Sequence, residues 1–162
     1  MNHIEIASNI CREFEGLVLK AYICPAGYWT IGYGNRFYED GTPVRKGQII
    51  TKERAEALLL NTLLDYDRQI TPVITANITI NQRAALLDFA FNAGPDIDAD
   101  TVAEGLGDST LLKYVNANPN DPKIKTEFLR WTKARNTKTG LLEVSPGLVR
   151  RRTREANTYF SK

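Results

Sequence analysis

The stretch from Glu15 to Gly34, EGLVLKAYICPAGYWTIGYG, breaks the helical periodicity of the chain with a turn and an alternating segment. Residues 24–27 read Cys-Pro-Ala-Gly, with proline second and glycine fourth, which are the preferences of a type I turn. Apolar and smaller residues alternate after this turn. The pattern predicts a β-hairpin in which Trp29 and Ile31 face a core while Thr30 points the other way.

A helix is expected before this hairpin, because apolar residues recur at helical spacing and glycine follows Glu15 as a natural stop. Glu15 is therefore expected at a helix C-terminus, where the dipole disfavours a charged carboxylate. Eight residues separate Glu15 from Cys24, and five separate Cys24 from Thr30. A compact helix-turn-hairpin can bring this carboxylate, thiol and hydroxyl to one cleft. Gly32 and Gly34 would leave the hairpin open to a ligand.

Helices are expected to dominate the rest of the chain. Thr79 and Gln82 match a capping box, and apolar residues on nearly every face mark the following helix as a buried central element. The other helices are expected at about residues 51–69, 109–117 and 123–135 and from Ser145 onward. The last helix is expected to bury a stripe that consists of Val149, Thr153, Ala156 and Phe160.

These elements predict a mostly helical α+β fold in a single domain of 162 residues. We expect a hairpin lobe at about residues 15–50, a connecting helix at 51–70, and a helical lobe at 79–162 on which the helix at 1–14 packs. Cys11, Trp131 and Tyr159 are expected in the core. The chain has 43% hydrophobic and 25% charged residues, which is typical of a globular protein.

The composition argues against a metal or a cofactor. Two cysteines and one histidine do not supply a zinc site. Asp96, Asp98 and Asp100 imitate the start of a calcium loop, but its sixth position holds Thr101 and its twelfth holds Gly107. A solvated loop is the better interpretation. No membrane anchor is expected either, because no apolar run approaches a membrane span and the N-terminus has no export signal.

Several motifs in order resemble one known family. The helix that ends in a glutamate before glycine, TIGYG at 30–34, FNAG at 91–94, STLL at 109–112 and PGLVRRR at 146–152 look like the phage-type lysozymes, or endolysins, of glycoside hydrolase family 24. The resemblance spans about residues 6–159. It implies a lysozyme-like fold and cleavage of the β-1,4 bond between N-acetylmuramic acid and N-acetylglucosamine in peptidoglycan. By position, Glu15 would be the general acid, with Cys24 and Thr30 in the second and third catalytic places.

Glycosidic cleavage needs a proton for the leaving oxygen and stabilisation of positive charge at the anomeric carbon. Glu15 suits the first task. A thiol with an ordinary pKa near 8.5 is mostly neutral at pH 7, so a geometric role is open for Cys24. Thr30 is interpreted as holding the attacking water, which favours an inverting course. The expected substrate-binding residues are Tyr28, Gly34, Arg36 and Asn92, of which Tyr28 would stack on a sugar ring.

Alternatives remain at this stage. A lytic transglycosylase would act on the same substrate, and a nucleic-acid-binding protein would use the basic last helix, although Arg150, Arg151 and Arg152 point in three directions and are expected to be mostly solvated or acid-paired. A cysteine hydrolase would need a base for Cys24, and the only histidine is His3.

Further expectations concern redox state, neighbours and location. A regulatory disulfide between Cys11 and Cys24 is a minor alternative. Asn35 and Arg36 stand where many relatives have a histidine, which places a cation near the cleft. We expect a monomer without nucleic-acid partners that is made in the host cytoplasm. It would reach peptidoglycan through holin-type release, unless a signal-arrest-release segment has been trimmed from the N-terminus.

Overall fold

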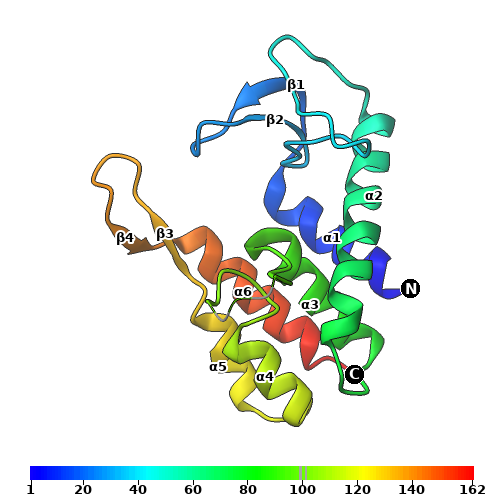
Figure 1. Ribbon diagram of the computed structural model, residues 1–162, viewed down its shortest axis with the longest axis vertical. Helices are drawn as coiled ribbons and strands as arrows, with labels where there is room; N and C mark the ends of the chain where they lie inside the picture. The colour runs from blue at the N-terminus through cyan, green and yellow to red at the C-terminus, as the bar shows by residue number, and fades with distance from the viewer. Residues whose placement is uncertain (99, 101) are drawn as a thin grey trace.

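The computed structural model describes residues 1–98, 100 and 102–162, and it confirms the mostly helical α+β class. A β-hairpin and its following loops lie at one end of the molecule, and a long helix runs from there along a bundle of shorter helices (Figure 1). The elements, in chain order, are α1 (His3–Glu15), β1 (Val18–Ile23), β2 (Trp29–Gly32), α2 (Lys52–Ile70), a 3₁₀ turn η1 (Thr71–Val73), α3 (Ile80–Ala93), α4 (Thr110–Ala117), α5 (Lys123–Leu129), β3 (Lys133–Arg135), β4 (Leu142–Val144) and α6 (Pro146–Tyr159).

Side-chain caps set the start of most helices. The hydroxyls of Thr51, Thr79, Ser109 and Ser145 each accept a hydrogen bond from the backbone amide three residues later. Such a bond satisfies one of the four amides that lack an intrahelical partner. The predicted capping box of α3 is confirmed, because Gln82 also reaches back to the Thr79 amide at 2.9 Å. Four of the predicted helix starts therefore agree with the structure.

The predicted hairpin is present, but its two faces differ from the expectation. The Gly27 amide donates to the Cys24 carbonyl at 2.8 Å and closes the turn, and Thr30 pairs with Tyr22 in an antiparallel register. Thr30 and Ile31 are both buried, at 3% and 0% exposure. A Cβ on Gly32 would lie 3.5 Å from Ala55 on α2. The prediction of an open face at Gly32 is thus wrong, because α2 covers the hairpin there.

The main core surrounds α3, which packs against α1, α2 and α6. Phe89 lies at its centre, with ring centroids 5.9 Å from Phe128 and 5.2 Å from Trp131 in edge-on geometry. Tyr159 is also buried, and so is Cys11. The expected core positions are confirmed, and α3 is the buried central helix that its sequence predicts.

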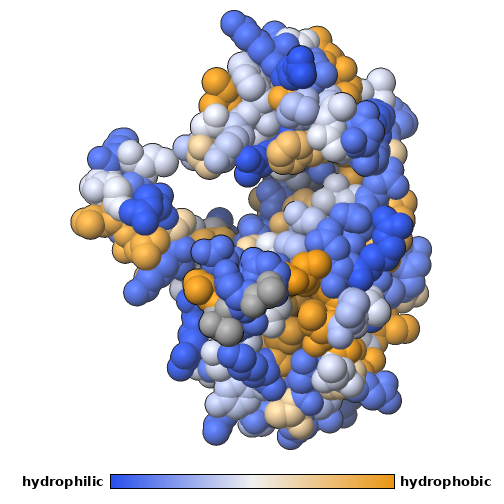
Figure 2. Space-filling view, viewed as in Figure 1, coloured by the Kyte–Doolittle hydropathy of each residue, from blue (hydrophilic) through white to orange (hydrophobic). Residues whose placement is uncertain are grey.

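Two expectations for the C-terminal third are wrong. The helix expected at 123–135 ends at Leu129, and its last residues form β3, which pairs with β4 in a second hairpin. This hairpin projects from the bundle and carries exposed Leu141, Leu142 and Val144 (Figures 1 and 2).

The expected apolar stripe of α6 is the second error. Val149, Thr153 and Phe160 are exposed or partly exposed, and of the stripe only Ala156 is buried. The buried face instead consists of Arg151, Arg152, Glu155, Ala156, Thr158 and Tyr159. Polar pairing inside the bundle, described below, replaces the expected apolar contact. No helix in the described part of the chain is long and apolar enough to span a membrane.

Candidate active site

A cleft of about 1010 Å³ lies between the hairpin end of the molecule and the helical bundle. The space-filling view shows this hollow beside the projecting second hairpin (Figure 2). Glu15 reaches the cleft from the end of α1, Gly34 and Arg36 line it from the loop after β2, and Asn92 lines it from α3. The structure therefore brings four of the seven predicted site residues to one cleft.

Local backbone geometry places Glu15 at the cleft. Gly16 has a φ of +62°, a conformation that favours glycine, and α1 ends there. Gly34 has a φ of +85°, and a Cβ on it would lie 3.1 Å from Glu15 Oε2. A side chain at position 34 would crowd the carboxylate, and the positive φ itself favours glycine there. Gly34 therefore lies directly beside the Glu15 carboxylate, whereas the sequence predicted only that it would contact the substrate.

The Glu15 carboxylate accepts a hydrogen bond from Arg151 Nη1. On the interior side of the same guanidinium, Nε and Nη2 donate to the two carboxylate oxygens of Asp88 at 3.0 and 2.8 Å. Arg151 is 3% exposed and Asp88 is fully buried. The acid in the cleft is therefore joined through one buried cation to a second carboxylate on α3.

A second buried arginine lies alongside. Arg152 is 1% exposed and donates to Glu155, to Asn92 and to the Trp131 carbonyl. The cluster was expected to be solvated or paired with acids, and the second alternative holds for Arg151 and Arg152, which are buried and bond to acidic side chains. These two guanidinium groups are not available to phosphates, which weakens the alternative of nucleic-acid binding.

Cys24 and Thr30 form a separate group at the hairpin turn. The Thr30 hydroxyl donates to the Tyr28 carbonyl at 3.0 Å and lies beside the Cys24 thiol. Partial burial raises the pKa of Cys24, but hydrogen bonds to the sulfur outweigh this effect, so the pKa lies below its ordinary value. The Tyr28 backbone favours the thiolate most, followed by the Thr30 hydroxyl, which donates to the sulfur when it turns from the Tyr28 carbonyl, and the charge of Arg36 adds to these effects.

Neither Cys24 nor Thr30 lines the cleft around Glu15. The Tyr22 side chain on β1 is influenced by both Cys24 and Glu15. Its pKa is raised, first by burial and then by the charges of Cys24 and Glu15. Both groups are therefore within electrostatic reach of one side chain on the hairpin. Cys11 and Cys24 are free thiols in the structure, and Cys11 donates to Asp88 Oδ1 at 3.1 Å.

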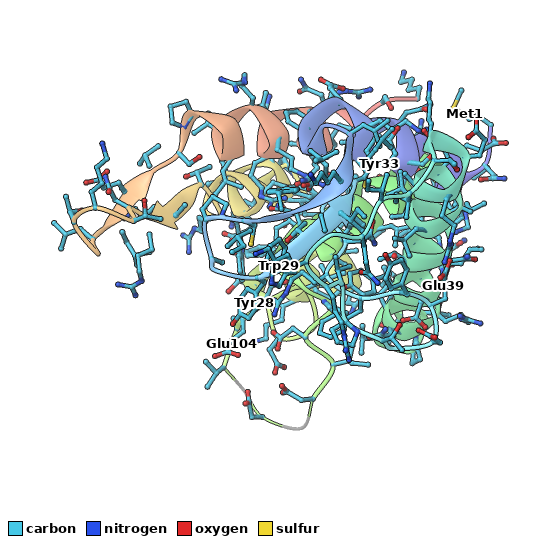
Figure 3. The ribbon with its side chains drawn as sticks, turned by 90° about the horizontal axis from the view of Figure 1, so that it is seen from above. Met1, Tyr28, Trp29, Tyr33, Glu39 and Glu104 are labelled. Atoms are coloured by element: carbon cyan, nitrogen blue, oxygen red, sulfur yellow. The ribbon has the colours of Figure 1, made fainter. Side chains whose placement is uncertain are left out.

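Tyr28 is 49% exposed and has only one ring face covered, so stacking of a sugar on its other face stays a prediction. The Arg36 guanidinium lies 3.4 Å from its ring centroid, so one face is occupied by a cation–π contact. Tyr28 and Trp29 lie together near the turn, whereas Tyr33 lies toward α1 and α2 (Figure 3). Arg36 is the cation expected near the cleft. Asn35 is buried and donates to Thr62 Oγ1 at 2.9 Å, which ties this loop to α2.

The acidic loop after α3 differs from the expected imitation of a calcium loop. Carboxylate oxygens of Asp96, Asp98 and Asp108 lie within 4.8 Å of one another. Asp100 instead accepts from the Val102 amide at 2.7 Å. Asp96 Oδ2 accepts two backbone amides, at 3.0 Å each, which accounts for its orientation within the loop. Thr101, the sixth position of the imitated motif, lies outside the described residues.

A two-lobed α+β fold with a carboxylate at the end of the first helix, facing the interlobe cleft, is the architecture of a lysozyme. A family model described as Phage lysozyme matches residues 12–155, and the chain belongs to this family. The endolysin of Acyrthosiphon pisum secondary endosymbiont phage 1 is 35% identical over 94% of this chain and 93% of its own length. The endolysin of Bacillus phage B103 is 34% identical over 99% of this chain, which spans only 55% of that relative's length.

Solved structures agree. An endolysin from Escherichia coli O157:H7 phage FAHEc1 superposes with a TM-score of 0.84 at 32% identity, covering 99% of this chain and 94% of that one. The muramidase domain of SpmX from Asticaccaulis excentricus superposes with a TM-score of 0.80 at 30% identity, covering 96% of this chain and 95% of that one. The predicted resemblance to phage-type lysozymes is therefore confirmed.

Sequence reasoning missed two residues of the site. In the sequence, Arg151 is one of three consecutive arginines, and nothing local distinguishes it from the other two. Asp88 lies within a largely apolar helix, where no neighbouring residue indicates its partner. One signal was present: Asp88 is the single charged residue in the run from Ala84 to Ala93. An isolated carboxylate on a helix that is apolar on all faces requires a buried cation as partner.

Proposed function

We propose that this protein is an endolysin-type muramidase, which hydrolyses the β-1,4 bond between N-acetylmuramic acid and N-acetylglucosamine in bacterial peptidoglycan. Glu15 acts as the general acid and protonates the leaving glycosidic oxygen. Peptidoglycan is the partner of the cleft, and the protein acts on the wall as a monomer after its release from the host cytoplasm.

One observation carries this proposal: among the acidic residues that line the cleft, Glu15 is the one at the end of α1 that Arg151 holds. The Glu15 side chain is 22% exposed, so it remains accessible to a polymer in the cleft. A cleft of this size, open at its sides, suits an extended chain of sugars better than a small ligand. The positions of Glu15 and Gly34 support the assignment.

Cys24 and Thr30 are proposed for the second and third catalytic places. The lowered pKa of Cys24 increases its thiolate fraction near neutral pH, which supplies negative charge for the positive charge that develops on the sugar. This electrostatic role replaces the purely geometric role that an ordinary thiol would have. The Thr30 hydroxyl, beside the sulfur, is proposed to orient the attacking water, with an inverting outcome.

The Glu15→Gln variant tests the proposal. An amide has nearly the same shape as the carboxylic acid but no proton to transfer, so we expect activity to fall by at least about a hundredfold. Purified peptidoglycan is digested, and the products are analysed by mass spectrometry. Reducing N-acetylmuramic acid ends are expected from the native protein, and none above background from E15Q.

Glu53→Gln is the matched control, because Glu53 is an exposed glutamate in the first turn of α2, outside the cleft. It should digest like the native protein. If the native protein released anhydro-muramic ends, the activity would be that of a lytic transglycosylase and not that of a hydrolase. Full activity in E15Q would contradict the role of Glu15 as the acid.

A further inference from the structure

The Arg151 guanidinium bonds to Asp88 on its interior side and to Glu15 on the side of the cleft. Asp88 accepts two parallel hydrogen bonds from the guanidinium, a bidentate arrangement that fixes both the position and the plane of the arginine. The rings of Phe14 and Phe91 lie 5.7 and 5.9 Å from the Arg151 guanidinium carbon. The guanidinium is therefore held rigidly between two carboxyl groups, one buried and one at the cleft.

Asp88 is held in turn by Cys11. The thiol donates to Asp88 Oδ1 at 3.1 Å, and burial raises the pKa of Cys11, so it remains a neutral donor at all working pH values. Asp88 thus accepts three hydrogen bonds inside the bundle, from α1 and α6, although it is fully buried itself. These three bonds satisfy the acceptor oxygens of the buried carboxylate and fix its orientation.

The other titratable groups around Arg151 do not replace Asp88. Glu155 Oε1 lies 3.7 Å from Arg151 Nε, but Glu155 accepts from Arg152, and burial together with the neighbouring Asp88 raises its pKa, which favours the neutral acid. Arg152 is itself held by Glu155. Tyr22, whose pKa responds to the charge of Glu15, lies on β1 and not in the helical bundle. Asp88 is therefore the interior anion that opposes the charge of Arg151.

We propose that Asp88 is a positioning residue for Glu15, which anchors the Arg151 guanidinium against the acid and balances its charge. Asp88 does not meet the substrate. This inference rests on the proposed role of Glu15 as a general acid. Without Asp88, the unbalanced charge of Arg151 would favour the ionised form of Glu15, so fewer molecules would hold the proton that the leaving oxygen needs.

Asp88→Asn tests this inference, because it removes the charge and keeps the size of the side chain. We expect the basic limb of the pH–kcat profile to move to lower pH by about one unit, with a roughly tenfold loss of kcat at neutral pH and little change in KM. A ¹³C NMR titration of labelled Glu15 should show the same displacement. This second readout needs no enzymatic activity.

Glu127→Gln is the matched control, because Glu127 is also buried and ion-paired, with Arg130 at 3.5 Å on α5. Its pH profile should coincide with that of the native protein. Unmoved kinetic and NMR profiles in folded D88N would overturn the inference. If D88N does not fold, the Glu155→Gln variant provides the test. Its pH–kcat profile should coincide with that of the native protein. A displacement of about one pH unit in E155Q would assign the balancing charge to Glu155 instead of Asp88.

The two proposals fail in different ways. If native protein releases no reducing muramic ends, or if E15Q is fully active, the proposed function is wrong, and the NMR titration still reports whether Asp88 controls Glu15. If E15Q is inactive and D88N behaves like the native protein, the proposed function stands and the role of Asp88 is wrong.

Discussion

Two cysteines in this chain have opposite chemical environments. Cys11 is fully buried in the bundle, and burial raises its pKa. Cys24 is partly exposed at the hairpin turn, and hydrogen bonds to its sulfur lower its pKa despite the opposing effect of burial. Since the thiolate is the reactive form, the two residues should differ strongly in reactivity.

We therefore expect iodoacetamide to modify one thiol in the native protein, Cys24, and both thiols after unfolding. The pH at which modification reaches half its maximal rate should lie below that of a free thiol, because the Cys24 pKa is lowered. Peptide mass mapping identifies the site, and wall digestion should fall as Cys24 is modified. Equal labelling of Cys11 in the native protein would contradict its burial.

The site could be predicted only where its residues are local in sequence. Glu15 is marked by the glycine after it and by the hairpin that follows. Asp88 and Arg151, in contrast, are 63 residues apart, and the sequence around one gives no indication that it pairs with the other. Three consecutive arginines do not show which of them will be buried or which acids will pair with them. Long-range charge pairing is thus the part of the site that local patterns cannot predict.

At the scale of elements, the capped helices were predictable because each cap is a local signal. The β3–β4 hairpin was missed for the same kind of reason. Its strands have three residues each and all are exposed, so no alternation of buried and exposed residues reveals them. The connecting segment 136–140 contains Asn136 and Gly140, which are turn residues, and this was the only available hint.

The N-cap of α3 should contribute measurably to stability. Replacing Thr79 with alanine removes the hydroxyl that accepts from the Gln82 amide at 3.2 Å. We expect a loss of about 1 kcal/mol in the free energy of unfolding, measured by urea denaturation. Thr79→Ser keeps the acceptor and should retain most of the stability. An unchanged midpoint in T79A would show that the contact of Gln82 with the Pro119 carbonyl, at 3.0 Å, suffices by itself.

For the whole molecule, stability depends on the aromatic cluster around α3. Phe89 contacts Phe128 and Trp131 edge-on, and the Arg152 guanidinium carbon lies 4.6 Å from its ring centroid. Phe89→Ala should lower the free energy of unfolding by about 3–5 kcal/mol, because it leaves a cavity and removes these contacts. Thermal and urea denaturation both measure the loss.

Ile80→Ala serves as the control on the same helix. Ile80 is 56% exposed, so its truncation should change stability by no more than about 0.5 kcal/mol. If F89A and I80A were equally stable, the bundle would not depend on this cluster.

The contact between Glu15 and Arg151 joins residues 136 positions apart, near opposite ends of the chain. During synthesis the helix that carries the acid emerges first, and the arginine that holds it follows 136 residues later. A chain that is still on the ribosome, or that ends before α6, therefore has the first hairpin and Glu15 but lacks Arg151, which holds the Glu15 carboxylate. The candidate active site stays incomplete until α6 has been made and can dock.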